Sequence, residues 1–297
     1  MTLSLLLLLG VIVVGLAACS PADAAYEEEI EAYRRQRIEG LRRPDGWLAL
    51  VGLYWLDEGE HSFGADFSNA VVFPPNAPPR IGTFVVEDST VTMRVEPGVP
   101  ITHDGQPVTE LVMADDHDGE PTVVHLASLS WHVIERSGRL GVRLRDSESP
   151  VRTGFDGIET FPTDPRWRIE GRFERYDPPR TARLPTIIAG MDEESTVPGA
   201  VVFEVDGEEY RLDVTGAPDA TQFFVVFGDA TSGHETYGGG RFLYVDAPDD
   251  NGRVVIDFNK AYNPPCVFTP YATCPIPTRE NRLPVRIPAG EKTWGDH

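Results

Sequence analysis

Short apolar runs separated by turn-forming residues fill most of the chain after its first 46 residues, and they constrain the fold most. One such stretch covers residues 47–144, with turns such as Ser137-Gly138 between its runs. A second runs from Ala200 to Phe258, where Asp206-Gly207 between two runs is a strong hairpin signal. Strand-length runs at this spacing are typical of β-sandwiches and barrels. We therefore predict a mostly β fold with two β-rich halves, each sandwich-like or barrel-like.

One helix is predicted before the first β-rich half, over residues 26–43. Its apolar side chains recur near one helical face: Tyr26, Ile30, Tyr33 and Leu41. Its first half is rich in Glu and its second half in Arg, which complements the helix dipole. Pro44 and Asp45-Gly46 end the pattern. These signals indicate a solvated helix that packs on the β structure.

Two proline-rich segments divide the remainder of the chain. Residues 150–198 are rich in Pro and Arg and predict an irregular bridge between the β-rich halves. After Phe258 the chain becomes proline-rich, and such a segment cannot join the interior of a sheet, so we expect it to wrap the surface. The predicted organisation is a helix with a first β half over 26–150. A bridge, a second β half and the proline-rich tail follow over 151–297.

The N-terminal segment has the properties of a secretory signal. Residues 1–18 carry no charged side chain, and the apolar run ends in Leu16-Ala17-Ala18-Cys19. A bilayer-spanning helix needs about 20 apolar residues, so this run is too short to cross comfortably. We therefore predict that residues 1–18 form a cleavable signal peptide.

The end of this signal resembles the lipobox of bacterial lipoproteins, in which the cysteine after the cleavage site carries the lipids. The resemblance implies lipidation of Cys19 and a lipidated tether over residues 19–25. Ser20 in place of Asp is similar to the pattern sorted to the outer membrane, so the expected location is the cell envelope, on the outer membrane and facing the periplasm. The alternative is an ordinary signal peptide that ends near a cysteine.

Charge limits the partners that the mature chain can bind. Lys and Arg total 26 against 47 Asp and Glu, which gives a formal net charge of −21. Such a field repels nucleic acid and anionic lipid. We therefore expect no nucleic-acid partner and contact with the membrane only through the lipid anchor, and a small molecule or an envelope component remains as the unknown ligand.

Several motifs resemble the bacterial family known as domain of unknown function 1684. They are Trp47–Leu56, Gly233–Leu243, Asp257–Cys266, Thr269–Pro275 and Glu280–Leu283, and the likeness extends over residues 26–292. The family has no established activity, so the resemblance implies membership and a shared fold but no reaction.

A weaker likeness concerns the first β half. His61–Pro74 is similar to the opening of a forkhead-associated β-sandwich. That family reads phosphothreonine with an Arg after the glycine, whereas here Ala65 follows Gly64. The resemblance therefore implies a sandwich without phosphopeptide binding.

Familiar catalytic signatures are missing, but one polar cluster has acid–base chemistry. The chain has no Gly-x-Ser-x-Gly, His-Glu-x-x-His, Walker or Gly-x-Gly-x-x-Gly motif. Between two apolar runs the chain carries five candidate catalytic residues: Asp229, His234, Glu235, Tyr237 and Arg241. A His with a carboxylate can transfer protons, and an Arg can bind an anion. The alternative is a polar network that fastens this loop to the proline-rich tail.

The tail supplies a second set of candidates. Its candidate binding residues are Asn259, Tyr262, Asn263 and Arg282. The same side chains can instead satisfy backbone groups in an irregular buried segment. On an earlier predicted strand, Arg143 and Arg145 alternate with Val142 and Leu144, which fits either a pocket wall or the polar face of a strand.

Cys266 and Cys274 are the cysteines left after Cys19, and they are eight positions apart. An even pair in an oxidising compartment predicts a disulfide, with a metal site or free thiols as the alternatives. The spacing matches no common zinc motif, and we expect neither a metal site nor a cofactor.

Two functions from different classes fit these observations. The first is a binding or scaffolding lipoprotein of the cell envelope. The alternative is an envelope hydrolase that uses the 229–241 loop with the tail as one wall of its site. The hydrolase requires Asp229, His234, Tyr237 and Arg241 to converge with the polar residues of the tail in one open cleft.

Overall fold

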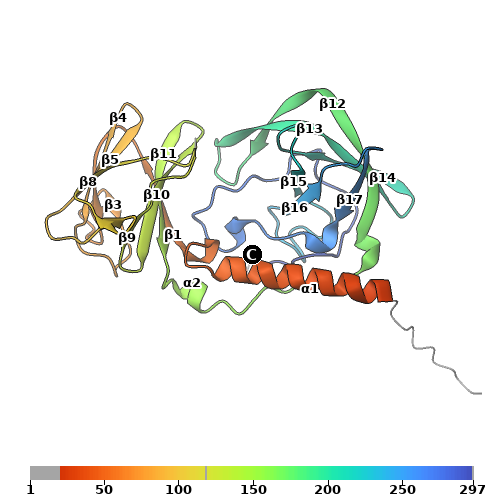
Figure 1. Cartoon of the computed structure of the whole chain (residues 1–297), viewed down its shortest axis with the longest axis horizontal. Coiled ribbons are helices and arrows are strands. Elements are labelled where there is room, and N and C mark those ends of the chain that lie inside the picture. The colour runs from red at the N-terminus through yellow and green to blue at the C-terminus, as the bar shows by residue number, and fades with distance from the viewer. Residues whose placement is uncertain (1–20, 118, 296–297) are drawn as a thin grey trace, which may run out of the picture.

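The computed structural model describes residues 21–117 and 119–295, and it confirms the mostly β fold with a helix at its start. The predicted signal peptide 1–18 and Cys19 lie outside the described residues. Of the described helices, none combines the length and the apolar character that a membrane span requires. Figure 1 shows two β-rich bodies side by side, with the helix running beneath one of them toward the other.

Helix α1 covers Pro21–Arg42, so it begins five residues earlier than the prediction of 26–43 and ends one residue earlier. Its apolar face buries Ile30 and Leu41. Its polar side chains bind the C-terminal half of the chain: the Tyr26 hydroxyl donates to Asp257 at 2.8 Å, and the Tyr33 hydroxyl donates to the Lys260 carbonyl at 2.9 Å. The helix is therefore fixed to the second β half, as its amphipathic pattern indicates.

The first β half consists of two sheets that enclose one core. In the described chain the sheet that adjoins the second half has the order β1-β11-β10-β9-β6-β7. Its strands are Leu50–Leu56, Arg139–Asp146, Leu129–Arg136, Val124–Leu126, Thr102–His103 and Gln106–Pro107. The other has the order β3-β2-β4-β5-β8, with strands Val71–Val72, Gly59–Gly64, Gly82–Glu87, Thr90–Val95 and Glu110–Met113. Phe63 stacks on Phe84 at 4.1 Å and meets Trp131 edge-on at 5.8 Å, so aromatic packing closes the space between the sheets.

The second β half is built around a long hairpin. The order β14-β13-β12-β17 joins Glu208–Val214, Asp192–Val205, Arg168–Pro185 and Arg253–Asp257. A separate pair joins β15, Gln222–Phe227, to β16, Arg241–Asp246. Val201, Val225 and Phe258 are fully buried in the core between them. Short helices connect these parts: α2 Pro150–Thr153, and the one-turn helices η1 Trp47–Ala49, η2 Pro165–Trp167, η3 Phe258–Lys260 and η4 Pro265–Val267.

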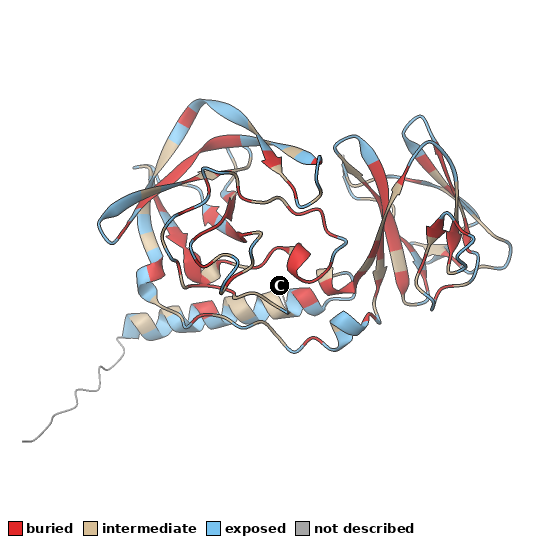
Figure 2. Cartoon of the chain, turned by 180° about the vertical axis from the view of Figure 1, so that it is seen from behind, coloured by how far each residue is buried: buried red, intermediate tan, exposed pale blue. Residues whose placement is uncertain are grey.

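Two expectations about irregular segments are corrected. The bridge over 150–198 contains most of the β12–β13 hairpin, whose outer part has exposed charged side chains on both faces. That part buries too little apolar surface to show a strand pattern. The tail is irregular, as predicted, but it does not simply wrap the surface. Its side chains Leu283, Ile287 and Ala289 belong to the second core, and Figure 2 shows buried segments through this part of the chain.

A small cluster between the halves joins the two cores. It contains Leu50 from β1, Val226 and Phe242 from the β15–β16 pair, and both cysteines of the tail. The Thr269 hydroxyl donates to the Leu50 carbonyl at 3.1 Å. The disulfide loop of the tail is therefore the element that contacts both halves at this point.

Candidate functional site

The loop between β15 and β16 holds a buried ion pair. Asp229 and Arg241 are 3.1 Å apart, and neither side chain is exposed. Asp229 also accepts the backbone N–H of Ile287 at 2.7 Å, and Arg241 donates to the carbonyl oxygens of Ile287, at 3.0 Å, and Ala289. Burial lowers the pKa of Arg241, and the Asp229 carboxylate opposes this shift. The pair therefore fastens the loop to the tail, as the structural alternative describes.

The other candidate catalytic residues of this loop point to different places. His234 is exposed. Glu235 forms a bidentate ion pair with Arg286 at 2.9 and 2.8 Å on the surface. Tyr237 packs on the cluster of α1 and tail residues that includes Leu41. The structure thus does not bring His234, Tyr237 and the buried pair into one cleft.

Of the four candidate binding residues of the tail, Asn259 lines a hollow beside α1 together with Arg34 and Glu291, and Asn263 and Arg282 lie outside that hollow. The Asn259 amide donates to the Tyr26 hydroxyl and to the Asp164 carbonyl, both at 2.9 Å. Asn263 is fully buried, and its amide donates to the Lys292 carbonyl at 2.6 Å. Arg282 is exposed. The two asparagines therefore hold the irregular backbone in place.

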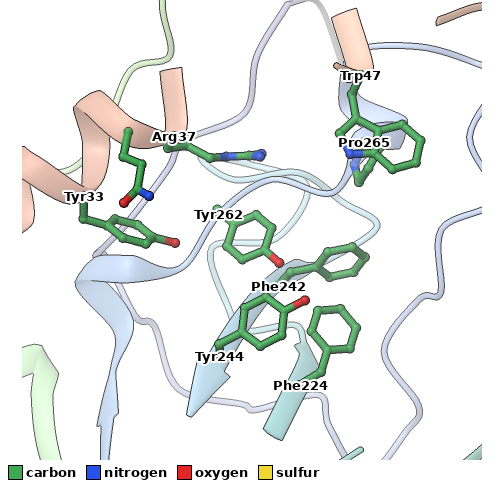
Figure 3. Close-up of a pocket in the computed structure, with 9 residues that line it drawn as sticks. Tyr33, Arg37, Trp47, Phe224, Phe242, Tyr244, Tyr262 and Pro265 are labelled. Carbon is green, nitrogen blue, oxygen red and sulfur yellow. The ribbon is translucent and has the colours of Figure 1, made fainter. Parts of the chain in front are cut away.

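Tyr262, the fourth candidate, lines a pocket of about 490 Å³ between α1 and the outer face of the β15–β16 pair. Six of the nine lining side chains are aromatic, and Figure 3 shows the Arg37 side chain at one edge of the pocket, beside Tyr262. The lining residues are Tyr33, Gln36, Arg37, Trp47, Phe224, Phe242, Tyr244, Tyr262 and Pro265.

The aromatic wall has a local cause in the sequence of β15 and β16. Phe223 and Val225 face the second core, so Phe224 between them faces outward. Phe224 pairs across the strands with Tyr244, whose side chain is 51% exposed. Aromatic residues on the outward face of a short strand pair were the signal that could have found this pocket from the sequence.

Arg37 is the one charged side chain of the pocket, and its plane is fixed. Its Nε donates to Glu291 at 3.1 Å and its Nη2 to the Asn263 carbonyl at 2.9 Å. The guanidinium lies 4.7 Å from the centre of the Tyr262 ring. Among the described residues, Nη1 has no hydrogen-bond partner. Burial raises the pKa of Glu291, and the charge of Arg37 opposes this shift.

Two tyrosines of the pocket, Tyr33 and Tyr262, stay neutral under ordinary conditions. Burial raises the pKa of Tyr33 to about 12, and burial with the nearby Tyr244 raises that of Tyr262. No lining residue is His, Asp or Glu. The arrangement can therefore bind an apolar body and an anionic group, and its own lining supplies no ordinary proton-transfer pair.

The tail cysteines form the predicted disulfide. Cys266 and Cys274 are bonded to each other, with Cα atoms 6.2 Å apart, and both are buried. In the described parts of the chain, no group of three or more His, Cys, Asp or Glu side chains is arranged to hold a metal ion.

These features define a two-part β protein with an aromatic pocket under its N-terminal helix. Residues 153–292 match the model of a family described as protein of unknown function (DUF1684), which bears out the predicted resemblance over this part of the chain. The matched region covers the second half and the tail, so the Trp47–Leu56 motif lies outside it. The lipobox and forkhead-associated resemblances remain predictions.

One solved structure among the matches is the solution NMR structure of the uncharacterized protein from gene locus rrnAC0354 of Haloarcula marismortui. It is 31% identical, with a TM-score of 0.41, and the match covers 49% of this chain and 81% of that chain. No curated protein matches the chain.

Proposed function

We propose that the protein is an exported, lipid-anchored binding protein of the bacterial cell envelope that takes a small amphipathic anion into the aromatic pocket. The observation that supports this function is the Arg37 guanidinium, held by Glu291 and the Asn263 carbonyl among six aromatic rings. A guanidinium fixed in this way loses little freedom when it binds a ligand.

The chemistry of the pocket favours one class of ligand. A lining of mostly aromatic side chains with a single charged group is typical of small-molecule sites, and the volume of about 490 Å³ suits such a ligand. The free Nη1 edge of Arg37 suits a carboxylate or another oxyanion, because charge-assisted hydrogen bonds are the strong ones. The rings would bury an apolar chain or ring.

The hydrolase alternative has less support. Asp229 and Arg241 bind each other, and the exposed His234 stands apart from them. The polar cluster of the 229–241 loop is therefore assigned a structural role in this proposal.

A matched pair of ligands tests the proposal. Octanoate and octanamide share an alkyl chain and differ in charge, so their affinities for the purified chain isolate the contribution of Arg37. We expect calorimetry to show at least about tenfold tighter binding of octanoate, since a hydrogen bond to a charged group contributes about 1.5–3 kcal/mol. In Arg37→Gln this preference should disappear.

Two further variants control the experiment. Arg35→Met removes one charge from the exposed side of α1, so it should leave the preference for octanoate unchanged. Tyr244→Ala removes a half-exposed ring, so it should weaken both ligands without unfolding the chain. Equal affinity of the wild-type protein for the two ligands, or no binding of either, would contradict the proposal.

A further inference from the structure

Two arginines face the second half from the sheet of the first half. On β11, Val142 and Leu144 point into the first core, so Arg143 and Arg145 lie on the opposite face. His132 of β10 pairs directly with Arg143 across the strands. Arg143 is only 4% exposed, because the disulfide loop of the tail covers this face.

Arg143 and Arg145 make few hydrogen bonds for charged groups that are largely buried. Arg143 donates to the Thr273 hydroxyl at 3.5 Å and lies 5.4 Å from the centre of the Trp47 ring. Arg145 contacts the Nδ1 of His132 at 3.1 Å. The Nε atoms of both arginines are buried without a hydrogen-bond partner, and no carboxylate of the described residues is ion-paired with either.

Three carboxylates act on the two arginines through their charges, Asp116, Asp45 and Glu193, and none of them forms an ion pair with either arginine. Asp116 is paired with Arg136 at 2.7 Å, and Asp45 with Arg43 at 2.8 Å. Burial raises the pKa of the Glu193 carboxyl, and the positive charges of Arg136 and Arg143 oppose this shift.

Burial and the neighbouring positive charges both lower the pKa values of Arg143 and His132. Burial lowers the pKa of Arg143 to about 10. Burial and then the charges of Arg145 and Arg143 lower the pKa of His132 to about 3, so its imidazole is neutral and accepts from Arg145.

Buried guanidiniums without a counter-charge destabilise the folded state. A buried ion normally needs a partner, because desolvation penalises the charged form. A chain with 47 Asp and Glu residues has ample carboxylates, yet among the described residues none forms an ion pair with these two arginines.

We propose that Arg143 and Arg145 bind an oxyanion, a phosphate or carboxylate group, between the first β half and the disulfide loop. The Thr273 hydroxyl lies beside Arg143 and can donate to the same group. This site is separate from the aromatic pocket and does not depend on the function proposed for it.

Anion-dependent melting tests the site in the purified chain, in buffers of equal ionic strength containing chloride, phosphate or acetate. We expect phosphate or acetate to raise the melting temperature by about 5 °C or more at a hundredfold excess over the dissociation constant. The anion that acts more strongly identifies the preferred group. In Arg143→Met the increment should disappear, and the chloride melting temperature should not fall, since an uncompensated charge is removed.

The controls separate this site from general salt effects. Arg139→Met alters the same strand at an exposed arginine stacked on Trp55, so it should keep the full increment. Arg37→Gln should keep it as well, which distinguishes this site from the aromatic pocket. An equal increment in Arg143→Met and the wild-type protein would overturn the proposal.

Direct binding decides the question if Arg143→Met fails to fold. For phosphate the readout is the ³¹P line width, and for acetate it is the methyl proton line width, each with the wild-type protein and with Arg145→Met. Broadening by the wild-type protein that is lost in Arg145→Met supports the site. An absence of broadening for both anions with the wild-type protein overturns it.

Discussion

At the scale of single residues, the same side-chain types have opposite roles in this chain. Arg241 is buried with Asp229 as its partner, whereas Arg143 is buried and forms no ion pair with a carboxylate of the described residues. Residue type alone cannot separate these cases, because both arginines lie on or beside strands in the sequence. Burial and the identity of the partner separate them.

The Asp229–Arg241 pair should be needed for stability. Asp229→Asn leaves the Arg241 guanidinium buried without its charge partner, which costs about 3–5 kcal/mol in such cases. Urea unfolding should show this loss, and Glu235→Gln should cost at most about 1 kcal/mol because its pair with Arg286 is exposed. A stable Asp229→Asn protein that no longer binds ligand would instead indicate a functional loop.

His132 should make the protein sensitive to acid. Its pKa in the folded state is about 3, below the ordinary value of 6.5, so the unfolded chain binds the proton more tightly. The stabilisation is therefore complete above pH 6.5 and is lost as the pH falls toward 3, by about 1.4 kcal/mol per pH unit below pH 6.

The acid sensitivity is measurable by urea unfolding at pH 7 and pH 5 in chloride buffers that contain no phosphate or carboxylate. His132→Gln should flatten the decline, whereas His125→Gln, at an exposed position on the neighbouring strand, should not. An identical slope in His132→Gln and the wild-type protein would show that other groups control the acid response.

At the scale of elements, the sequence predicts what depends on local burial. The helix and the Asp206-Gly207 hairpin follow from side-chain periodicity and turn residues, and both are present. The outer part of the β12–β13 hairpin could not be predicted, since its exposed charged faces carry no apolar alternation.

The aromatic pocket likewise could not be predicted from local sequence patterns. Its residues come from α1, η1, the β15–β16 pair and the tail, so they extend from Tyr33 to Pro265 in the sequence. The sequence makes Tyr262 a candidate because it lies in a polar motif of the tail. It does not single out Arg37, because no local pattern reports that Glu291 and Asn263 lie against it.

At the scale of the whole molecule, the proposed envelope role depends on the leader. In a bacterium fed an alkyne analogue of palmitate, the full-length chain should incorporate the label, and Cys19→Ser should abolish it. Ser20→Ala should keep the label. Recovery of the wild-type chain in the cytosol with residues 1–18 intact would contradict the proposal.

The early start of α1 has a mechanical consequence. The helix is already formed at Pro21, two positions after Cys19 in the sequence. At 1.5 Å per residue, its 22 residues form a helix about 33 Å long. The hydroxyl groups of Tyr26 and Tyr33 bind this helix to the second half through hydrogen bonds. In an acylated molecule this helix would lie between the lipid-bearing end of the chain and the pocket. The aromatic pocket lies beside the middle of the helix. The length of the helix would therefore limit how far the pocket can lie from the lipid surface.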